Sequence, residues 1–164
     1  MKDDLVLLVV GSGGREFAVA KKLKESPHVK TVYCAPGNVG MQTIGVETVP
    51  IEETDLDGLL EFAKNKKVDW TFVGPENVLC AGITDKFNEA GQKIFGPNQR
   101  AAQLEGSKDY ALRFMSKYNI PTARYETYAS AETCIAGLKN FDYPVVIKED
   151  GLAGGKGVTI AQNQ

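Results

Sequence analysis

The sequence predicts an α/β protein in which a doubly wound, Rossmann-like parallel sheet is followed by a truncated α+β portion. One observation is the apolar run from Leu5 to Val10, which is typical of a strand buried on both faces of a parallel sheet. Another is the alternation of strand-like and helix-like segments over the first hundred residues. The last is the change after residue 104, where an amphipathic helix and a glycine-rich strand pair replace that alternation.

The first hundred residues contain several strands and helices that the sequence pattern predicts. Strands are expected at residues 5–10, 29–35, 46–51, 69–74 and 93–96. Helices are expected at residues 15–25, 55–65 and 81–91. Asp55 or Thr54 can cap the second of these helices. Ligands of such sheets bind beyond the carboxyl ends of the strands, where a glycine cluster, PGN and GPE all fall.

The rest of the chain follows a different pattern. A helix is expected at residues 108–118, and another at residues 131–138. The apolar face of the first comprises Tyr110, Ala111, Phe114, Met115 and Tyr118. Strands are expected at residues 143–150 and 158–161. A hairpin with one helix is too small to enclose a core, so we expect this second unit to be cut short.

Composition and charge exclude several classes of function. The 164 residues are 43% hydrophobic and 24% charged, as in a soluble globular protein. The net charge of −2 leaves no broad basic field for nucleic acid, and no segment reaches the ~20 apolar residues of a membrane helix. Cys34, Cys80 and Cys134 are widely spaced, which predicts reduced thiols in a cytoplasmic protein. The only histidine, His28, has no co-ligand near it in the sequence, so no metal site is expected.

The stretch VVGSGGREFAVA, residues 9–20, places a glycine cluster between an expected strand and an expected helix. A dinucleotide fingerprint, G-x-G-x-x-G, matches at Gly11 and Gly13 but meets Glu16 at its third glycine. The acidic residue that would hold a ribose hydroxyl is also absent, since the second strand ends YCAPGN. A nicotinamide or flavin nucleotide is therefore disfavoured.

A smaller anionic group fits this loop better. The glycines of residues 11–14 let the backbone approach closely, and the next helix directs its N–H groups toward the loop. Arg15 can add a charge-assisted hydrogen bond, and Ser12 a hydroxyl. Glu16 lies in the first helical turn, where the helix dipole favours a carboxylate. A tight strand-to-helix turn without a ligand is the alternative interpretation.

A second glycine-rich stretch, VVIKEDGLAGGKGV, joins the last two expected strands. Lys148 ends the first of them, where its aliphatic stem would be buried and its ammonium group could reach a phosphate. Lys156 adds a second cation, but Gly157 stands where a Walker A loop requires Ser or Thr. A flexible hairpin of this kind suits a lid that closes over a triphosphate. An ordinary mobile hairpin is the alternative.

Several stretches together resemble the phosphoribosylamine–glycine ligase family, also called glycinamide ribonucleotide synthetases, of the ATP-grasp enzymes. In chain order they are GSGGRE, PGN, VGPE with AGI.D.F, IFGP with AAQLEGSK, IPTA.Y and VIK.DGLA.GKGV. They cover nearly the whole chain, and AAQLEGSK and DGLA.GKGV are the most specific.

The resemblance implies a division of the chain and a reaction. Residues 1–104 would form a substrate-binding, pre-ATP-grasp domain, residues 105–120 a linking helix, and residues 121–164 the incomplete start of the ATP-grasp lid subdomain. ATP, with Mg²⁺ or Mn²⁺, would phosphorylate glycine, and 5-phosphoribosylamine would attack the resulting glycyl phosphate. The products would be glycinamide ribonucleotide, ADP and phosphate, in purine biosynthesis. The partners would be small molecules rather than nucleic acid or membrane, and a cytoplasmic monomer is expected.

The resemblance also implies which residues bind these molecules. The substrate cradle would comprise Gly11, Ser12, Gly13, Gly14, Arg15, Glu16, Pro36, Gly37, Asn38, Gly74, Pro75 and Glu76. The ATP phosphates would contact Lys108, Lys148, Gly151, Gly154, Gly155, Lys156 and Gly157. Within the cradle, Glu76 would hold ribose hydroxyls or the amine. No catalytic residue or metal ligand is assigned within the chain, and the metal ligands are expected beyond its end. We therefore expect the chain alone to be inactive.

The sequence departs from the family pattern at a few positions. Phe17 replaces a histidine that usually follows GRE, while Glu149 and Gly154 stand where alanine is more frequent. Two other functions fit the same residues. One is a different ATP-grasp enzyme, such as a carboxylase of purine or biotin metabolism. The other is a non-catalytic module that binds a sugar phosphate or a nucleotide.

Overall fold

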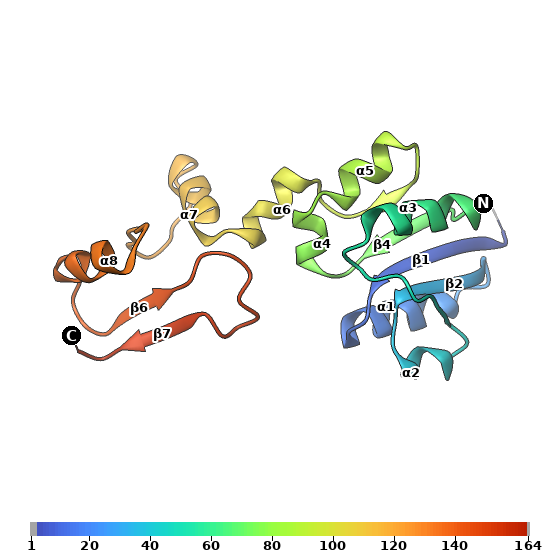
Figure 1. Cartoon of the computed structure of the whole chain (residues 1–164), viewed down its shortest axis with the longest axis horizontal. Helices are drawn as coiled ribbons and strands as arrows, with labels where there is room; N and C mark the ends of the chain where they lie inside the picture. The colour runs from blue at the N-terminus through green and yellow to red at the C-terminus, as the bar shows by residue number, and fades with distance from the viewer. Residues whose placement is uncertain (1–2, 164) are drawn as a thin grey trace. The chain divides into compact units, whose positions relative to one another are not determined.

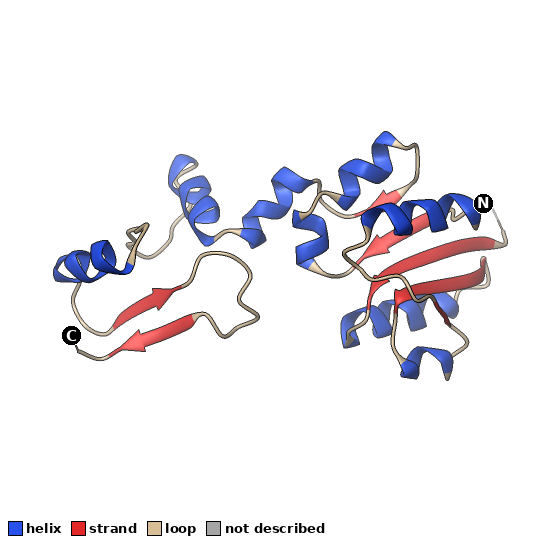
Figure 2. Cartoon of the chain, in the orientation of Figure 1, coloured by secondary structure: helices blue, strands red, loops and turns tan. Residues whose placement is uncertain are grey.

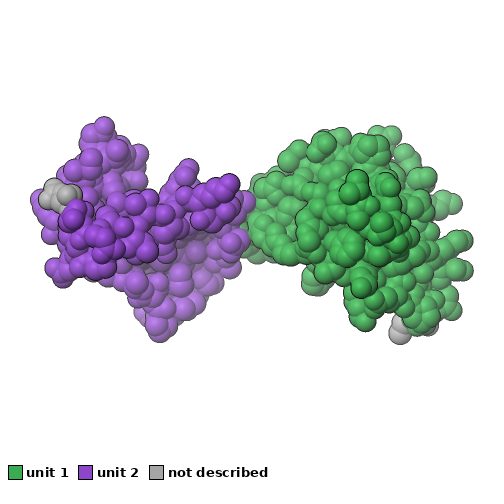
Figure 3. Space-filling view, turned by 90° about the horizontal axis from the view of Figure 1, so that it is seen from below, with its two compact units in different colours: residues 1–102 green, residues 103–164 purple. Residues whose placement is uncertain are grey.

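The computed structural model describes residues 3–163, which fall into two compact units divided between Ala102 and Gln103 (Figure 3). The first unit contains the parallel sheet, and the second contains a hairpin of two antiparallel strands. None of the helices within residues 3–163 combines the length and the apolar character that crossing a membrane requires.

A parallel sheet of five strands forms the centre of the first unit (Figure 1). The strands are β1 (Leu5–Gly11), β2 (Val29–Pro36), β3 (Glu47–Thr48), β4 (Trp70–Val73) and β5 (Ile94–Phe95). Their spatial order is β3-β2-β1-β4-β5, and every neighbouring pair is parallel. Because the chain builds outward from β1 in both directions, the sheet is doubly wound, which confirms the predicted fold class. The edge strands β3 and β5 are shorter than predicted, because only two residues of each pair with the neighbouring strand.

Helices cover both faces of this sheet (Figures 1 and 2). They are α1 (Gly14–Lys24), α2 (Val39–Gln42), α3 (Leu56–Asn65), α4 (Glu76–Cys80) and α5 (Ile83–Glu89). The next helix, α6 (Gln99–Gly106), crosses the division between the two units. Leu8 and Val10 of β1 pack in one core cluster with Phe87 of α5. Val9, between them, packs in a second cluster with Met41 of α2. All three β1 residues are fully buried, which explains why the strand is apolar without alternation.

Three short helices, α2, α4 and α6, lie outside the predicted ones. The helix α2 begins after Asn38, whose side chain accepts a hydrogen bond from the Gly40 N–H at 3.0 Å. The helix α4 ends just before Gly82, whose φ of +92° separates it from α5. The side chain of Asn98 accepts from the Ala101 N–H at 2.8 Å in the first turn of α6. Local polar contacts at Asn38 and Asn98, rather than a long apolar period, define two of these starts.

The second unit contains α7 (Lys108–Lys117), α8 (Ala131–Gly137), a short 3₁₀ helix (Leu138–Asn140), β6 (Val145–Lys148) and β7 (Val158–Ala161). Val145 is its only buried apolar side chain within residues 103–163. Its exposed large apolar residues are Leu104, Phe114, Tyr118, Ile120, Ile135, Val146, Ile147, Leu152, Val158 and Ile160. The apolar face predicted for the helix at 108–118 is therefore only partly covered, with Tyr118 55% exposed.

Candidate functional site

Three loops leave the carboxyl edge of the sheet beside one another. The register pairs Gly11 of β1 with Pro36 of β2, and Val10 of β1 with Val73 of β4. The Gly37 N–H donates to the Gly11 carbonyl at 3.1 Å. The Gly74 N–H donates to the Val10 carbonyl at the same distance. The glycine cluster and the PGN and GPE segments therefore emerge from three adjacent strands, as the sequence predicted for a single site.

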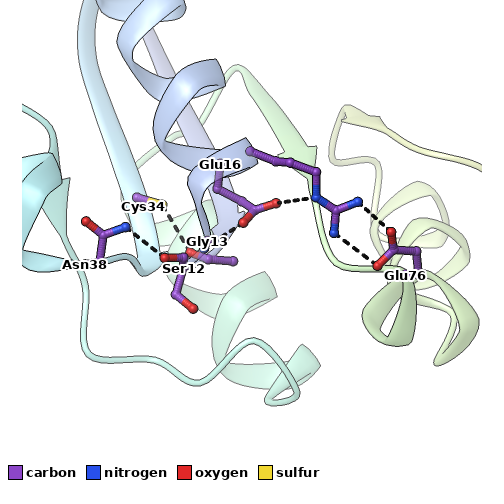
Figure 4. A network of polar contacts seen from close by, with 8 residues as sticks. Ser12, Gly13, Glu16, Cys34, Asn38 and Glu76 are labelled. Carbon is purple, nitrogen blue, oxygen red and sulfur yellow. Dashed lines mark hydrogen bonds and ion pairs between the residues drawn. The ribbon is translucent and has the colours of Figure 1, made fainter. Parts of the chain in front are cut away.

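Polar side chains join these three loops (Figure 4). The Asn38 amide donates to the Ser12 carbonyl at 2.8 Å and so connects the second loop to the first. Two guanidinium nitrogens of Arg15 donate to the two carboxylate oxygens of Glu76, at 2.6 and 3.2 Å. This bidentate pair connects the first loop to the third. The three loops are thus held together by contacts within the chain.

The Arg15–Glu76 pair changes the ionisation of both groups. The hydrogen bond from Arg15, with help from the backbone N–H of Glu76 and the charge of Arg15, lowers the pKa of Glu76 against the opposing effect of burial. The hydrogen bond and charge of Glu76 raise the pKa of Arg15. Both side chains are substantially exposed, 67% for Arg15 and 37% for Glu76, so water screens the pair. Its main effect is to orient the two groups rather than to stabilise the fold.

Glu16 is the least exposed of the predicted site residues that carry a charge, with 3% of its surface accessible. Its Oε2 atom accepts from the Gly13 N–H at 2.7 Å, the arrangement of a helix-capping carboxylate. Its Oε1 atom accepts no hydrogen bond and lies 4.0 Å from the Arg15 Nε. The carboxylate is thus directed into the loop (Figure 4). This orientation leaves other groups to contact a ligand.

The side chain of Glu16 also fills the space next to two glycines. A methyl carbon added to Gly11 would come within 2.7 Å of the Glu16 Cγ. One added to Gly74 would overlap the Glu16 carboxylate. The Cys34 thiol supports the same turn by donating to the Gly11 carbonyl at 3.3 Å. A glutamate in the place of the third fingerprint glycine therefore completes the loop with its own side chain, which agrees with the disfavoured dinucleotide.

The groups that remain at this edge are suited to an anion. The N–H groups of Gly14 and Arg15 lie in the first turn of α1, where no intrahelical acceptor is available. The exposed Ser12 side chain and the Arg15 guanidinium lie on the same loop. Gly37, with φ +70°, provides the turn that brings Asn38 back to Ser12.

Phe17, which replaces the family histidine, belongs to the core rather than to the ligand-facing edge. Its ring packs against the cluster that contains Val9 and Met41. A methyl carbon added to Gly40 would lie 3.5 Å from the Phe17 Cε2. The ring therefore lies beside Gly40 in the first turn of α2.

The second glycine-rich loop connects β6 to β7 and is closed by its own backbone. The Glu149 N–H donates to the Gly157 carbonyl at 2.8 Å, and the Lys156 N–H donates to the Ala153 carbonyl at 2.9 Å. Positive φ values occur at Gly151, Gly154 and Gly155, with open space around each of these residues. These glycines are therefore needed for backbone conformation rather than for a close approach.

The three predicted lysines occupy different environments within the second unit. Lys108, at the start of α7, donates from its ammonium group to the Gly151 carbonyl at 2.7 Å and so contacts the loop. Lys148 and Lys156 are exposed. The expected burial of the Lys148 stem is not observed, because its neighbours Val146 and Ile147 on β6 are exposed as well.

Asp150 is a residue of this loop that sequence reasoning missed. Its carboxylate contacts the N-terminus of α7, where it accepts from the Lys108 N–H at 2.6 Å. Asp150 ends an expected strand and forms a DG pair with Gly151, which is a turn signal and does not indicate this distant partner. Within residues 3–163, no group of three or more His, Cys, Asp or Glu side chains could hold a metal ion.

Solved structures define the class of this architecture. A biotin carboxylase from Campylobacter jejuni, in a complex with an ATP analogue, aligns with a TM-score of 0.74 at 19% identity. The alignment covers 96% of this chain and 38% of that one. The phosphoribosylamine–glycine ligase from Thermotoga maritima aligns with a TM-score of 0.72 at 34% identity, covering 97% of this chain and 36% of that one. The chain thus has the fold of the matched part of these enzymes, and the class of this fold is that of the ATP-grasp enzymes.

Family models identify the particular group. The N domain of phosphoribosylglycinamide synthetase matches residues 5–105, and the ATP-grasp (A) domain of the same synthetase matches residues 106–164. The chain belongs to the phosphoribosylglycinamide synthetase family. The phosphoribosylamine–glycine ligase of Lactococcus lactis subsp. lactis is 54% identical over 155 residues. That match covers 94% of this chain and 38% of the relative, so the chain spans little more than a third of the relative's length.

Proposed function

We propose that the protein to which this chain belongs ligates glycine to 5-phosphoribosylamine at the expense of ATP. The observation that carries the proposal is the convergence of three loops around Arg15 at the carboxyl edge of the sheet. Such an edge offers first-turn N–H groups and a guanidinium to a phosphate. The 54% identity to a phosphoribosylamine–glycine ligase supports the choice of substrate.

The first unit binds the sugar phosphate in this proposal. The phosphate accepts hydrogen bonds from the N–H groups of Gly14 and Arg15 and from the hydroxyl of Ser12, and it contacts the Arg15 guanidinium. Glu76 is the acceptor for ribose hydroxyls or for the amine. Glu16 supports the loop and does not contact the phosphate, since its carboxylate already accepts a hydrogen bond from the Gly13 N–H. The other cradle residues, which shape the walls, are Gly11, Pro36, Gly37, Asn38, Gly74 and Pro75.

The second unit contributes to ATP binding. Lys108, Lys148 and Lys156 supply positive charge to the phosphates, and the loop of residues 151–157 covers them. ATP, with Mg²⁺ or Mn²⁺, supplies an activated phosphoryl group that glycine takes up on its carboxylate as ADP leaves. The amine of phosphoribosylamine then attacks the carbonyl carbon, the C–O bond to phosphate breaks, and the amide forms. The charged loop serves to bind and orient the phosphates before this step.

Calorimetry on the purified chain tests the substrate assignment. Ribose 5-phosphate, a stable analogue without the amine, should bind saturably with a stoichiometry near one, whereas NADH should not bind. Saturable binding of NADH without binding of ribose 5-phosphate would contradict the proposal. A companion assay measures ADP formed in the presence of glycine and phosphoribosylamine. We expect none from this chain, which spans 38% of the relative's length, and glycine-dependent turnover from a full-length relative.

Two other candidate functions predict different outcomes of the same experiments. A non-catalytic module should bind ribose 5-phosphate and have little or no affinity for ATP. A purine-pathway or biotin-dependent carboxylase should consume ATP with bicarbonate rather than with glycine. The structural likeness to such a carboxylase is at 19% identity and concerns the fold, so glycine is the preferred substrate.

A further inference from the structure

Asp150 connects two segments of the second unit that lie far apart in the sequence. Its Oδ1 atom accepts from the N–H groups of Lys108 and Asp109, at 2.6 and 3.2 Å. Its Oδ2 atom accepts from the Ser107 hydroxyl at 3.0 Å. These donors form the N-terminus of α7, 41 to 43 residues before Asp150. A loop carboxylate therefore satisfies N–H groups that the helix itself leaves without a partner.

Lys108 is held at both its backbone and its side chain. Its N–H donates to Asp150, and its ammonium group donates to the carbonyl of the next residue, Gly151, at 2.7 Å. Ordering a lysine side chain costs rotamer entropy, and the hydrogen bond from the ammonium group to Gly151 already restricts this side chain. An ammonium group has three N–H bonds, so two are left for other acceptors.

We propose that Asp150 is a positioning residue that fastens the glycine loop to the N-terminus of α7 and thereby aims the Lys108 ammonium group at the loop. A carboxylate is well suited to this place, because the partial positive charge of a helix N-terminus stabilises it. The consequence for ATP phosphates rests on the proposed function, whereas the fastening itself does not.

The ionisation of Asp150 agrees with this role. Burial favours the neutral acid and acts to raise the pKa of Asp150. The hydrogen bonds from Asp109, Ser107, Gly151 and Lys108 outweigh burial, so the pKa of Asp150 lies below its ordinary value. The carboxylate should therefore stay charged, and the loop fastened, until the pH falls through that lowered pKa.

Two other carboxylates, those of Asp109 and Glu149, belong to residues next to this contact in the sequence. The Asp109 carboxylate forms an ion pair with the Arg113 Nε and accepts a hydrogen bond from the Thr127 hydroxyl, both at 2.8 Å. Among residues 3–163, the side chain of Glu149, one residue before Asp150, has no hydrogen-bond or ion-pair partner. Glu149→Gln therefore removes the same charge from the adjacent position, and serves as the matched control for Asp150→Asn.

The first test follows backbone amide signals of the isotope-labelled chain by NMR as the pH is lowered from about 6 to about 2.5, a range that spans ordinary aspartate ionisation. In the wild type and in E149Q, the Lys108 and Asp109 amides should shift together with a midpoint below about 3.9. In D150N that step should disappear. In D150A these two amides should also exchange with solvent about tenfold faster, the scale of a lost helix cap. A step that persists unchanged in D150N would overturn the proposal, and D150N keeps the test valid if D150A fails to fold.

The second test uses inorganic tripolyphosphate as the probe, with binding read from the same amide signals. Removing a negative charge near an anion site should by itself tighten binding, and E149Q should show this or no change. If Asp150 positions Lys108, D150N should instead weaken binding by about threefold to tenfold. Equal tightening in D150N and E149Q would mean that Asp150 only repels the anion, and would overturn the positioning role. Failure of the wild type to bind tripolyphosphate would contradict the proposed ATP site, while the pH titration would still decide whether Asp150 fastens the loop.

Discussion

Arg15 and Glu76, 61 residues apart in the sequence, form two hydrogen bonds of 2.6 and 3.2 Å across adjacent loops of the sheet edge. Arg15 is the cation that we assign to the substrate phosphate, and it is paired with a carboxylate of the chain itself. A phosphate must either share the guanidinium with Glu76 or displace it. Because Arg15 is 67% exposed, additional N–H donors remain accessible to an incoming anion.

Arg15→Ala should weaken binding of ribose 5-phosphate by about tenfold or more, since a charge-assisted hydrogen bond to the phosphate is lost. Arg100→Ala, which removes another exposed arginine of the same unit, is the control and should leave the affinity unchanged. Calorimetry measures both. Equal affinities of R15A and the wild type would show that the phosphate binds elsewhere.

Glu76→Gln should strengthen binding of inorganic phosphate by roughly threefold to tenfold, because the amide no longer competes as an anion for Arg15. The same substitution should not strengthen binding of ribose 5-phosphate to the same extent, since Glu76 is also the proposed acceptor for the sugar. Fluorescence or calorimetric titration with the two ligands gives the comparison. Weaker phosphate binding in E76Q would contradict the competition between Glu76 and the ligand.

The pH dependence of the Arg15–Glu76 pair has a defined sign. Because Arg15 lowers the pKa of Glu76, the pair is fully formed above the ordinary glutamate pKa of about 4.3 and is lost as the pH falls through the lowered value. The carboxyl carbon signal of Glu76 should therefore titrate below about 4.3 in the wild type. In R15A its midpoint should rise. An unchanged midpoint would show that Arg15 does not hold this carboxylate in solution.

Glu16→Ala should destabilise the first unit by about 1–3 kcal/mol, because it removes the acceptor of the Gly13 N–H and opens a void beside Gly11 and Gly74. Glu16→Gln keeps an acceptor and most of the volume, so its cost should be smaller. Urea unfolding measures the two free energies. Unfolding curves of E16A that coincide with those of the wild type would mean that Glu16 is not part of the loop's support.

Gly74→Ala should cost about 1–3 kcal/mol, since the new methyl group would overlap the Glu16 carboxylate. Gly14→Ala is the matched control: it lies in a helix and no atom approaches the added carbon within 4 Å. That variant should be neutral or stabilised by up to about 1 kcal/mol. The reverse order of stabilities would contradict the packing of Glu16 against Gly74.

Cys34 should resist thiol reagents in the folded protein. Burial, with the nearby charge of Glu16, raises the pKa of Cys34 to about 12. Folding therefore favours the neutral thiol. Its contribution to the free energy of unfolding is fully present below the ordinary thiol pKa and is lost as the pH rises toward 12. At pH 8, mass spectrometry should find Cys134 labelled at least about a hundredfold faster than Cys34. Comparable rates would indicate that β2 opens readily.

The parts of the fold that the sequence predicted are those set by local patterns. The unbroken apolar run of β1 follows from burial on both faces, and Asp55 caps α3 through the Gly58 N–H at 2.9 Å. The position of the three loops at one edge follows from parallel strands, whatever residues the loops contain. These features depend on near neighbours or on strand direction alone.

The features that the sequence did not predict depend on distant partners. The pattern placed Glu16 in a first helical turn, but only the structure shows its side chain turned onto Gly13 and Gly74. The contact of Asp150 with Lys108 spans 42 residues and leaves no periodic signal. The prediction that the Lys148 stem is buried was wrong. Whether a strand is covered depends on elements elsewhere in the chain, which a local pattern does not reveal.

The proposed function depends most directly on the binding of a phosphorylated sugar at the carboxyl edge of the sheet. The decisive measurement is an NMR titration of the labelled chain with ribose 5-phosphate, read at every backbone amide. We predict saturable shifts concentrated at residues 12–15, 37–40 and 74–76, with little change elsewhere in the first unit. Saturation with shifts confined to other residues, or no saturable shift at these three loops, would contradict the central claim.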